Sequence, residues 1–363
     1  MIDFSDIKFD CKHFKTGLPC NKNKVLDVIC NNCNHYEPIK TRILIIKLGA
    51  LGDVIRTTPL IEKFRAKFPN AHITWITLSP QILPQKSIDK IYEWNFNSLY
   101  IIENLAYDIA INLDKDLEAC ILLSKIKAES KFGYTFKDNH ISPATPEAEH
   151  KLITGQFDII SKNNTKSYLK EIFEICQFEF NNEEYLINLN EDLSTKWNQK
   201  FNTLSKGKKI IGLNTGCGPR WNTRLWPEES WKELASELNK LGYYPVFLGG
   251  ELEHEKNKRM SEESETYYPG HFSLEEFIAI TNNCEYIVTQ VSMMMHIATA
   301  LKKKLILCNT IFNKHEFEMY NRGVIVDPPY PCECYFGNSC SKGIPCMTYI
   351  TPQTIVKAVT SLS

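Results

Sequence analysis

Short apolar runs alternate with amphipathic segments along most of this chain, and the alternation stops once and then restarts. The clearest runs lie at 43–46, 71–77, 107–113, 209–216, 243–250, 284–290 and 303–309. Such short, unbroken and largely β-branched runs are typical of strands buried on both faces of a parallel sheet. Because they alternate with helices in two successive halves, they predict an α/β fold with two Rossmann-like domains that face each other across a cleft.

The length of the chain agrees with two domains and two short extensions. A chain of 363 residues exceeds one ordinary core and suits two domains of roughly 150 residues each. The stretch 181–208 is polar and separates the two halves. The predicted parts are a Cys-rich N-terminal extension at 1–40, an N-terminal Rossmann-like domain at 41–190, a C-terminal Rossmann-like domain at 205–328, and a Cys-rich segment with the C-terminal helix at 329–363.

Charge and hydropathy exclude some classes of partner. The chain has 42 basic and 43 acidic residues and a net charge of -1, so it has no general attraction to nucleic acid. No run approaches the ~18 apolar residues needed to cross a bilayer, and the opening MIDFSDIKFD lacks the charged and apolar regions of a signal peptide. We therefore expect a cytoplasmic protein without a nucleic-acid partner.

Thirteen cysteines are many for a cytoplasmic chain, and eight of them crowd its two ends. The N-terminal group is Cys11, Cys20, Cys30 and Cys33, and the C-terminal group is Cys332, Cys334, Cys340 and Cys346. In a reducing compartment, four clustered thiols favour a metal site over disulfides, and four sulfurs suit zinc, a single iron or an iron–sulfur cluster. The alternative is eight free or partly paired thiols. We expect a structural metal that staples the extensions or builds a homo-oligomer, at one shared site or at two.

The segment 42–64, RILIIKLGALGDVIRTTPLIEKF, places an acid directly after a buried strand. Gly49 and Gly52 permit a tight turn, and apolar residues then recur at helical spacing. Asp53 therefore lies at the carboxyl end of a strand, where open α/β sheets bind their ligands. Two interpretations remain open: a carboxylate that acts as a general base, or the N-cap of the following helix.

Three strand ends in the second half suit a nucleotide ligand, because helix N-termini there can meet its phosphates. NTGCGPRWNTRLWP (214–227) supplies glycines and arginines, LGGELEHEKNK (248–258) an acid for the ribose hydroxyls, and VTQVSMMMHIATAL (288–301) a serine and a histidine. The predicted donor-binding residues are Gly52, Thr215, Gly216, Arg220, Arg224, Glu251, Ser292 and His296. The alternatives are a surface loop with solvated arginines, an acid that only caps a helix, and a structural histidine.

Several of these motifs occur together in one known family. ILIIKLGALGDVIRTTPLI, NTG with RLWP, GGELE, MMMHIATAL and TIFNKHEFEMYNRG resemble glycosyltransferase family 9, the heptosyltransferases, in a branch with terminal cysteine clusters. The resemblance runs from about residue 42 to the C-terminus. It implies the GT-B fold, with the acceptor bound by the first domain and the nucleotide-sugar donor by the second. It also implies an inverting transfer of heptose from ADP-heptose to lipopolysaccharide core, while a related branch modifies autotransporter proteins.

The resemblance also assigns roles to single residues. Asp53 matches the catalytic carboxylate, and Arg224 matches a basic residue at the donor phosphates. Glu251 matches an acid near the nucleotide ribose, and His296 matches the histidine of the donor element. No catalytic metal is implied.

The chain departs from the family pattern in that donor element. Val291 stands in place of the usual Asp, and Met293 in place of the glycine, which removes a carboxylate and a close-approach site. Two other functions therefore stay open: a GT-B nucleotide-sugar epimerase, and a non-catalytic sugar-nucleotide-binding or metal-scaffolded assembly protein. The acceptor stays open among a lipid-linked glycan, a polysaccharide and a protein. A lipid-linked acceptor would bring the protein to the inner face of the cytoplasmic membrane.

Overall fold

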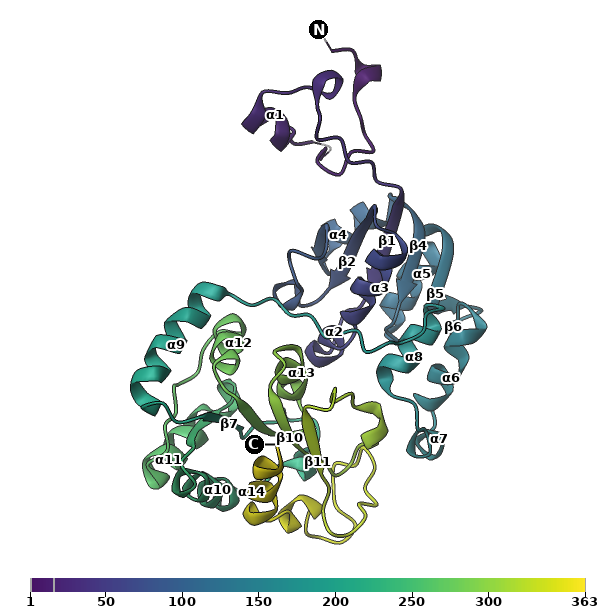
Figure 1. The fold of residues 1–363 in the computed structure, drawn as a ribbon. Helices are drawn as coiled ribbons and strands as arrows, with labels where there is room; N and C mark the ends of the chain where they lie inside the picture. The colour runs from purple at the N-terminus through teal and green to yellow at the C-terminus, as the bar shows by residue number, and fades with distance from the viewer. Residues whose placement is uncertain (1, 16, 363) are drawn as a thin grey trace.

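The computed structural model describes residues 2–15 and 17–362, and Figure 1 shows two α/β domains with an N-terminal extension that projects away from the second domain. Each domain is built on its own sheet, which confirms the predicted α/β architecture. The helices α2 (Leu51–Ile55) and α13 (Met293–Ala300) lie between the two sheets (Figure 1). In the described ranges, no helix has the length and apolar character needed to cross a membrane.

The first sheet has the order β3-β2-β1-β4-β5-β6. Its strands are β1 (Thr41–Ile46), β2 (Ala71–Thr77), β3 (Lys90–Glu93), β4 (Ala106–Asn112), β5 (Lys127–Lys137) and β6 (His140–Pro143). All pairs are parallel except β5 and β6, which form an antiparallel hairpin at the edge. Along β1, Ile43 and Ile45 enter one apolar cluster while Leu44 and Ile46 enter another, so the strand is buried on both faces as the sequence predicts.

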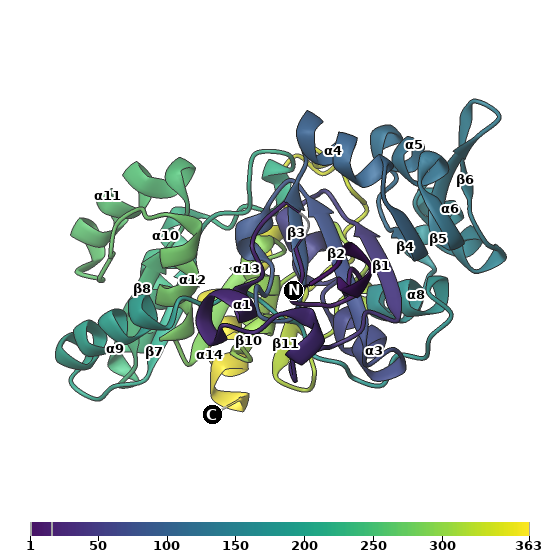
Figure 2. The ribbon, with the colours of Figure 1, turned by 90° about the horizontal axis from the view of Figure 1, so that it is seen from above.

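The helices around the first sheet are short, and Figure 2 shows them on either side of its strands. They are α3 (Pro59–Lys67), α4 (Phe96–Glu103), α5 (Leu117–Lys125), α6 (Glu149–Thr154), α7 (Asp158–Lys162) and α8 (Tyr168–Ile175), while α1 (Asn21–Leu26) belongs to the N-terminal extension. Within the described residues of that extension, Cys11 alone is buried. The extension therefore has no apolar core of its own.

The second sheet is parallel throughout and has the order β11-β10-β9-β7-β8. Its strands are β7 (Ile210–Asn214), β8 (Tyr244–Leu248), β9 (Tyr286–Gln290), β10 (Lys304–Cys308) and β11 (Gly323–Val326). Its other helices are α9 (Glu191–Ser205), α10 (Glu228–Lys240), α11 (His254–Ser264), α12 (Leu274–Asn282) and α14 (Pro352–Ser361). Helix α9, which the predicted bounds leave unassigned, packs on α12, where the Trp197 indole donates to Glu276 at 2.9 Å.

The two cysteine groups lie in different parts of the molecule. Helix α14 packs on α10, and the Trp226 indole donates to the Ile350 carbonyl at 2.8 Å, so the C-terminal segment belongs to the second domain. The N-terminal extension joins the far end of the first domain (Figure 1). The alternative of one metal site shared by both groups is therefore wrong.

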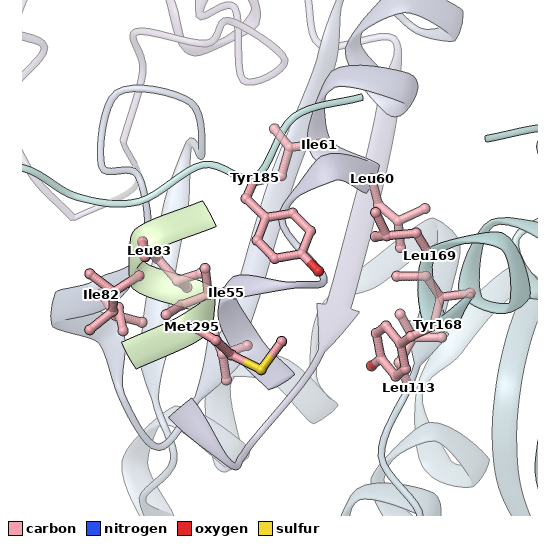
Figure 3. Packing of buried hydrophobic residues seen from close by; sticks show 14 of the residues in the cluster. Ile55, Leu60, Ile61, Ile82, Leu83, Leu113, Tyr168, Leu169, Tyr185 and Met295 are labelled. Carbon is pink, nitrogen blue, oxygen red and sulfur yellow. The ribbon is translucent and has the colours of Figure 1, made fainter. Parts of the chain in front are cut away.

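The domains share part of their apolar core. Figure 3 shows Met295 of α13 near Ile55 of α2 and Leu83, with Tyr185 of the interdomain linker close by, and all four belong to one buried cluster. Gly52 is essential to this contact, since a Cβ at that position would lie 2.5 Å from the His296 ring. Only a glycine lets α13 approach α2 this closely. The close packing brings the first turn of α2 to the edge of the second domain.

Candidate active site

Asp53 lies in the first turn of α2, directly after β1 and its loop. Ala50, and not Asp53, is the N-cap residue, so the interpretation of Asp53 as a helix cap is wrong. The carboxylate Oδ1 pairs with Arg56 Nη2 at 2.7 Å, and the Asp53 side chain is 35% exposed. No hydrogen bond from the described part of the chain reaches Oδ2. One oxygen of the acid is thus fixed while the other is open to a ligand.

The charges around Asp53 keep its carboxyl ionised. Burial opposes ionisation, but the positive charges of Arg56 and Lys47 outweigh it and hold the pKa of Asp53 below its usual value. Arg56 itself is nearly enclosed, with its guanidinium carbon 3.5 Å from the centre of the Tyr168 ring and Nη1 3.9 Å from Glu316. Although burial opposes the charge, Asp53 and Tyr168 raise the pKa of Arg56. Asp53 is therefore a carboxylate at neutral pH.

A buried ion pair supports the loop beneath this acid. Lys47 pairs with Asp114 after β4 and also donates to the Gly49 carbonyl at 2.5 Å, while the Leu48 amide donates to Asp114. Burial opposes the charge on Lys47, yet Tyr168, Asp114 and Asp53 raise its pKa. These contacts join β1 to β4 and fix the turn from which Asp53 emerges.

A hollow of about 400 Å³ lies at the carboxyl ends of β7, β8 and β9, where the sequence predicts the donor. Gly216 and Ser292, two of the predicted residues, line it. Leu51 of α2 lines it too, so the hollow reaches the helix that carries Asp53. Its remaining walls are Asn214, Cys217, Gly218, Gly249, Gly250, Glu253, His271, Phe272, Leu274, Phe277, Met293 and Met294.

Polar groups gather at the floor of this hollow, where β7 and β9 end. The Asn214 side-chain amide donates to Thr289 Oγ1 at 2.9 Å and lies 3.4 Å from Ser292 Oγ. Ser292 is the N-cap of α13 and accepts from the Met294 amide at 3.3 Å. The positive end of the α13 dipole thus points at the hollow, where it favours an anionic group.

Glu253, and not the predicted Glu251, lines the hollow. Glu251 is exposed and does not line the hollow, whereas Glu253, two residues on, accepts from the Gly250 amide at 3.0 Å. A Cβ at Gly216 would lie 2.3 Å from the Glu253 carboxyl carbon, so the glycine makes room for this acid. The signal for Glu253 is its place three residues after Gly250, at the third position of a short 3₁₀ turn (Glu251–Glu253). The role predicted for Glu251 stays a prediction.

The two predicted arginines are placed differently. The Arg224 guanidinium is buried and donates to the carbonyls of Cys217 and Val291, so it ties the loop after β7 to the loop after β9. Arg220 is exposed, with its guanidinium 4.4 Å from the centre of the Trp221 ring. Neither lines the hollow. Arg224 shapes the walls of the hollow, and a phosphate contact by either residue stays a prediction.

Thr215 and His296 also lie outside the hollow. Thr215 is buried and donates to the Asn257 side chain at 2.6 Å. His296 packs on Gly52 and stacks with Tyr185 at 6.1 Å between ring centroids. Burial, with the charge of Arg56, lowers the pKa of His296 to about 3, so the ring is neutral. Thr215 thus braces the second domain internally, and His296 packs at the junction of the two domains. A donor contact by either residue stays a prediction.

The cysteine groups differ in how closely their thiols approach. All four N-terminal cysteines line one hollow of about 260 Å³ inside the extension. In the C-terminal group, the Cys334 thiol lies near those of Cys332 and Cys340, and the Ser341 amide donates to its sulfur at 3.4 Å. Among the described residues, no three His, Cys, Asp or Glu side chains lie in an arrangement that could hold a metal ion. The metal sites therefore stay a prediction. The thiols are suitable ligands for zinc or iron, but the described side chains are not arranged as a complete metal site.

Two facing Rossmann-like domains, with a hollow on the second and a partly exposed acid on the first, define the GT-B class of fold. The sequence model of glycosyltransferase family 9 (heptosyltransferase) matches residues 101–326, and the chain belongs to this family. A glycosyltransferase family 9 structure from Veillonella parvula superposes with a TM-score of 0.67 at 21% identity, over 90% of this chain and 98% of that one. This likeness agrees with the predicted GT-B fold.

Two named relatives extend the comparison. Lipopolysaccharide heptosyltransferase 2 of Salmonella typhimurium is 30% identical over 113 residues, or 29% of this chain, and the match spans about a third (32%) of that relative's length. The dodecameric iron-containing heptosyltransferase TibC of enterotoxigenic Escherichia coli, solved in complex with ADP-D-β-D-heptose, superposes with a TM-score of 0.56 at 11% identity. That superposition covers 89% of this chain and 76% of TibC.

Proposed function

We propose that this protein is an inverting glycosyltransferase that moves a heptose, or a related sugar, from ADP-heptose to a glycan, lipid-linked or protein acceptor. The observation that carries the proposal is Asp53, an ionised acid with one open oxygen, on a helix whose Leu51 lines the hollow of the second domain. Membership of the heptosyltransferase family and the ADP-heptose bound to TibC support the choice of donor.

In this mechanism the first domain supplies the base. Asp53 Oδ2 accepts the proton of the acceptor hydroxyl as its oxygen attacks the anomeric carbon, and the bond from that carbon to the diphosphate breaks on the opposite face. A single displacement of this kind inverts the configuration. General-base assistance typically contributes roughly 100- to 10,000-fold to the rate.

The second domain binds the donor and stabilises the leaving diphosphate. We place the diphosphate at the N-terminus of α13, above Ser292, because the positive end of the helix dipole there stabilises developing negative charge. The apolar walls at Phe272 and Phe277 suit the nucleobase. Arg224 holds the loops after β7 and β9 together through their carbonyls. Glu253 accepts hydrogen bonds from hydroxyl groups of the donor.

The cysteine groups are proposed to hold a structural metal, zinc or iron or an iron–sulfur cluster, without a part in the chemistry. Two sets of four thiols supply a donor set that suits these ions, and TibC is an iron-containing and dodecameric relative in fold. Elemental analysis of anaerobically purified protein is expected to find near-stoichiometric zinc or iron. Its loss in Cys30→Ser/Cys33→Ser or Cys340→Ser/Cys346→Ser would locate the site, and a metal-free, folded and active protein would reject the proposal.

The transferase proposal is tested by following ADP release from ADP-heptose, with a heptose-free core oligosaccharide, a polysaccharide or a protein offered as acceptor. Transfer that depends on Asp53 supports the proposal, and the acceptor that reacts identifies the substrate class. Epimerised sugar nucleotide without ADP release would instead identify an epimerase. Binding of ADP-heptose in calorimetry without any turnover would identify a non-catalytic binder. A cytoplasmic site of action, at the inner membrane face for a lipid-linked acceptor, belongs to the same proposal.

A further inference from the structure

Arg56 is an arginine beside the candidate base that the sequence analysis does not assign. It lies one turn after Asp53 on α2, and its side chain is 14% exposed. Its guanidinium contacts three parts of the chain: Asp53 on the same helix, the Tyr168 ring on α8, and Glu316 in a 3₁₀ turn (Lys314–Glu316) of the second domain. A single side chain thus connects the base to both domains.

The contact with Glu316 is held in place by its neighbours. Asn313 precedes the turn that carries Glu316, and its side-chain amide donates to the carbonyls of Ser161 and Asn164 at 2.8 and 2.7 Å. Both acceptors belong to the first domain, around α7. The Ser161 hydroxyl also lies 2.7 Å from the Tyr335 hydroxyl of the second domain. These interdomain contacts hold the turn that carries Glu316 against the first domain.

The Arg56 contacts are not those of a residue kept for stability alone. Its Nε is buried and has no hydrogen-bond partner within the described chain, which is unusual for a buried donor. The Nη2 contact holds Oδ1 of Asp53 and so restricts rotation of the carboxylate. Because a base must lie within hydrogen-bond reach of the proton that it takes, an oriented oxygen is worth more than a freely rotating one.

A cation beside a general base also weakens it, because it stabilises the charged form of the acid. Glu316 acts against this effect. Its carboxylate lies 3.9 Å from Nη1 and offsets part of the guanidinium charge when the domains are arranged as here. Lys47 beneath Asp53 and the neutral His296 beside it complete the groups that face the acid, with Tyr168 and Tyr185 around the arginine.

We propose that Arg56 is a positioning residue that orients Asp53 for proton transfer, and that Glu316 strengthens the base by sharing the guanidinium only when the two domains are closed on each other. Base strength is thereby coupled to the position of the second domain, which carries the donor. An open cleft leaves Asp53 fully paired with Arg56 and a poor base. This inference rests on the proposed function, since it takes Asp53 as the base.

The proposal predicts opposite effects of two substitutions on the pH dependence of kcat/KM for ADP-heptose turnover. Arg56→Met removes the cation, so the low-pH side of the profile (the acid limb), where Asp53 becomes protonated, moves to higher pH. Loss of the orienting contact also lowers kcat roughly 10- to 100-fold, with little change in the KM for the donor. Glu316→Gln removes the opposing anion while it keeps the shape, so the acid limb moves to lower pH and kcat falls roughly 2- to 10-fold. Arg56→Lys restores the position of the limb but only part of kcat.

Arg65→Met is the matched control, because Arg65 forms a similar pair with Asp89 at 2.5 Å in the same domain, away from the hollow. It should change neither the limb nor kcat, and thermal unfolding of each variant excludes loss of the fold. Wild-type kcat and limb in Arg56→Met would overturn the proposal, as would limbs that move in the same direction in both variants. Wild-type turnover in Asp53→Asn would instead overturn the base assignment itself.

A second measurement needs no substrate. In protein labelled with ¹³C at the aspartate carboxyls, the Asp53 resonance is the one absent from Asp53→Asn, and its titration gives the pKa of that carboxyl directly. The pKa is expected to rise in Arg56→Met, to fall in Glu316→Gln and to stay constant in Arg65→Met. An unchanged Asp53 titration in Arg56→Met would overturn the proposed role of the arginine, whatever the acceptor or the activity.

Discussion

The carboxyl edges of the two sheets carry different kinds of side chain. The edge of the first sheet carries ionised side chains packed closely together, with Lys47 paired to Asp114 and Arg56 paired to Asp53. The edge of the second sheet offers glycine turns, uncharged amides and hydroxyls, apolar walls and the acid Glu253. Its buried arginine, Arg224, donates to the backbone carbonyls of Cys217 and Val291. Under the proposed mechanism, the first edge carries out proton transfer and the second edge recognises the shape of the ligand.

Removal of the acid at the first edge should have the largest effect on activity. Asp53→Asn keeps the size of the side chain but cannot accept a proton, so kcat should fall roughly 100- to 10,000-fold while the Kd for ADP stays nearly constant. Steady-state ADP release and calorimetry measure the two quantities. A loss of ADP affinity as large as the loss of kcat would contradict the assignment of catalysis to the first domain and donor binding to the second.

The ion pair beneath Asp53 should matter to the fold as much as to the site. Lys47→Met leaves Asp114 buried without its cation, and breaking a buried pair in this way typically costs about 3–5 kcal/mol of unfolding free energy. Lys166→Met is the matched control, because its pair with Glu174 is exposed and should contribute under about 1 kcal/mol. Chemical denaturation measures both. Equal losses in the two variants would show that the first edge is an ordinary charged surface.

At the second edge, Arg224→Ala should weaken ADP binding without removing the base. Its charged hydrogen bonds to the Cys217 and Val291 carbonyls hold the walls of the hollow, and such bonds contribute roughly 1.5–3 kcal/mol, or about 10- to 100-fold in Kd. Arg220→Ala is the control, since Arg220 is exposed and contacts an aromatic ring. A larger loss of ADP affinity in Arg220→Ala would mean that the exposed Arg220 binds the diphosphate, rather than the loops that Arg224 holds together.

The sequence predicts the backbone of both edges better than their side-chain partners. Asp53, Gly216 and Ser292 follow buried strands directly, so local pattern is sufficient to place them at the strand ends. The pairing of Arg56 with Glu316 joins residues 260 positions apart, and no local pattern reports it. Glu251 and Glu253 illustrate the limit at short range, because the phase of a single 3₁₀ turn decides which of the two acids faces the hollow.

The cysteines show the same limit in another form. Spacing groups Cys11, Cys20, Cys30 and Cys33 correctly around one hollow, because the extension is short and its ends are tied together. Spacing does not reveal that the C-terminal group packs with the second domain, since that depends on the docking of α14 on α10. Local sequence thus predicts membership of each group, while tertiary packing decides how far apart the groups lie.

The smallest expected effect lies at the junction of the two edges, at His296. The ring is buried and neutral, and burial with the charge of Arg56 lowers its pKa to about 3, far below its usual value near 6.5. In the unfolded chain the ring gains a proton as the pH falls below about 6.5, and in the folded chain it does not, so the native state loses stability on acidification. Between pH 6.5 and 5 this single group should remove about 1.5 kcal/mol of unfolding free energy.

His296→Leu should abolish that contribution while ADP affinity is kept, because the ring contacts Gly52 and Tyr185 and does not line the hollow. The measurement is the difference in unfolding free energy between wild type and variant at pH 6.5 and at pH 5, which cancels the titration of the other histidines. The variant should lose less stability than the wild type over this interval. If ADP affinity falls instead and the pH dependence is unchanged, His296 contributes to donor binding. The junction of the domains would then be part of the donor site of the second domain.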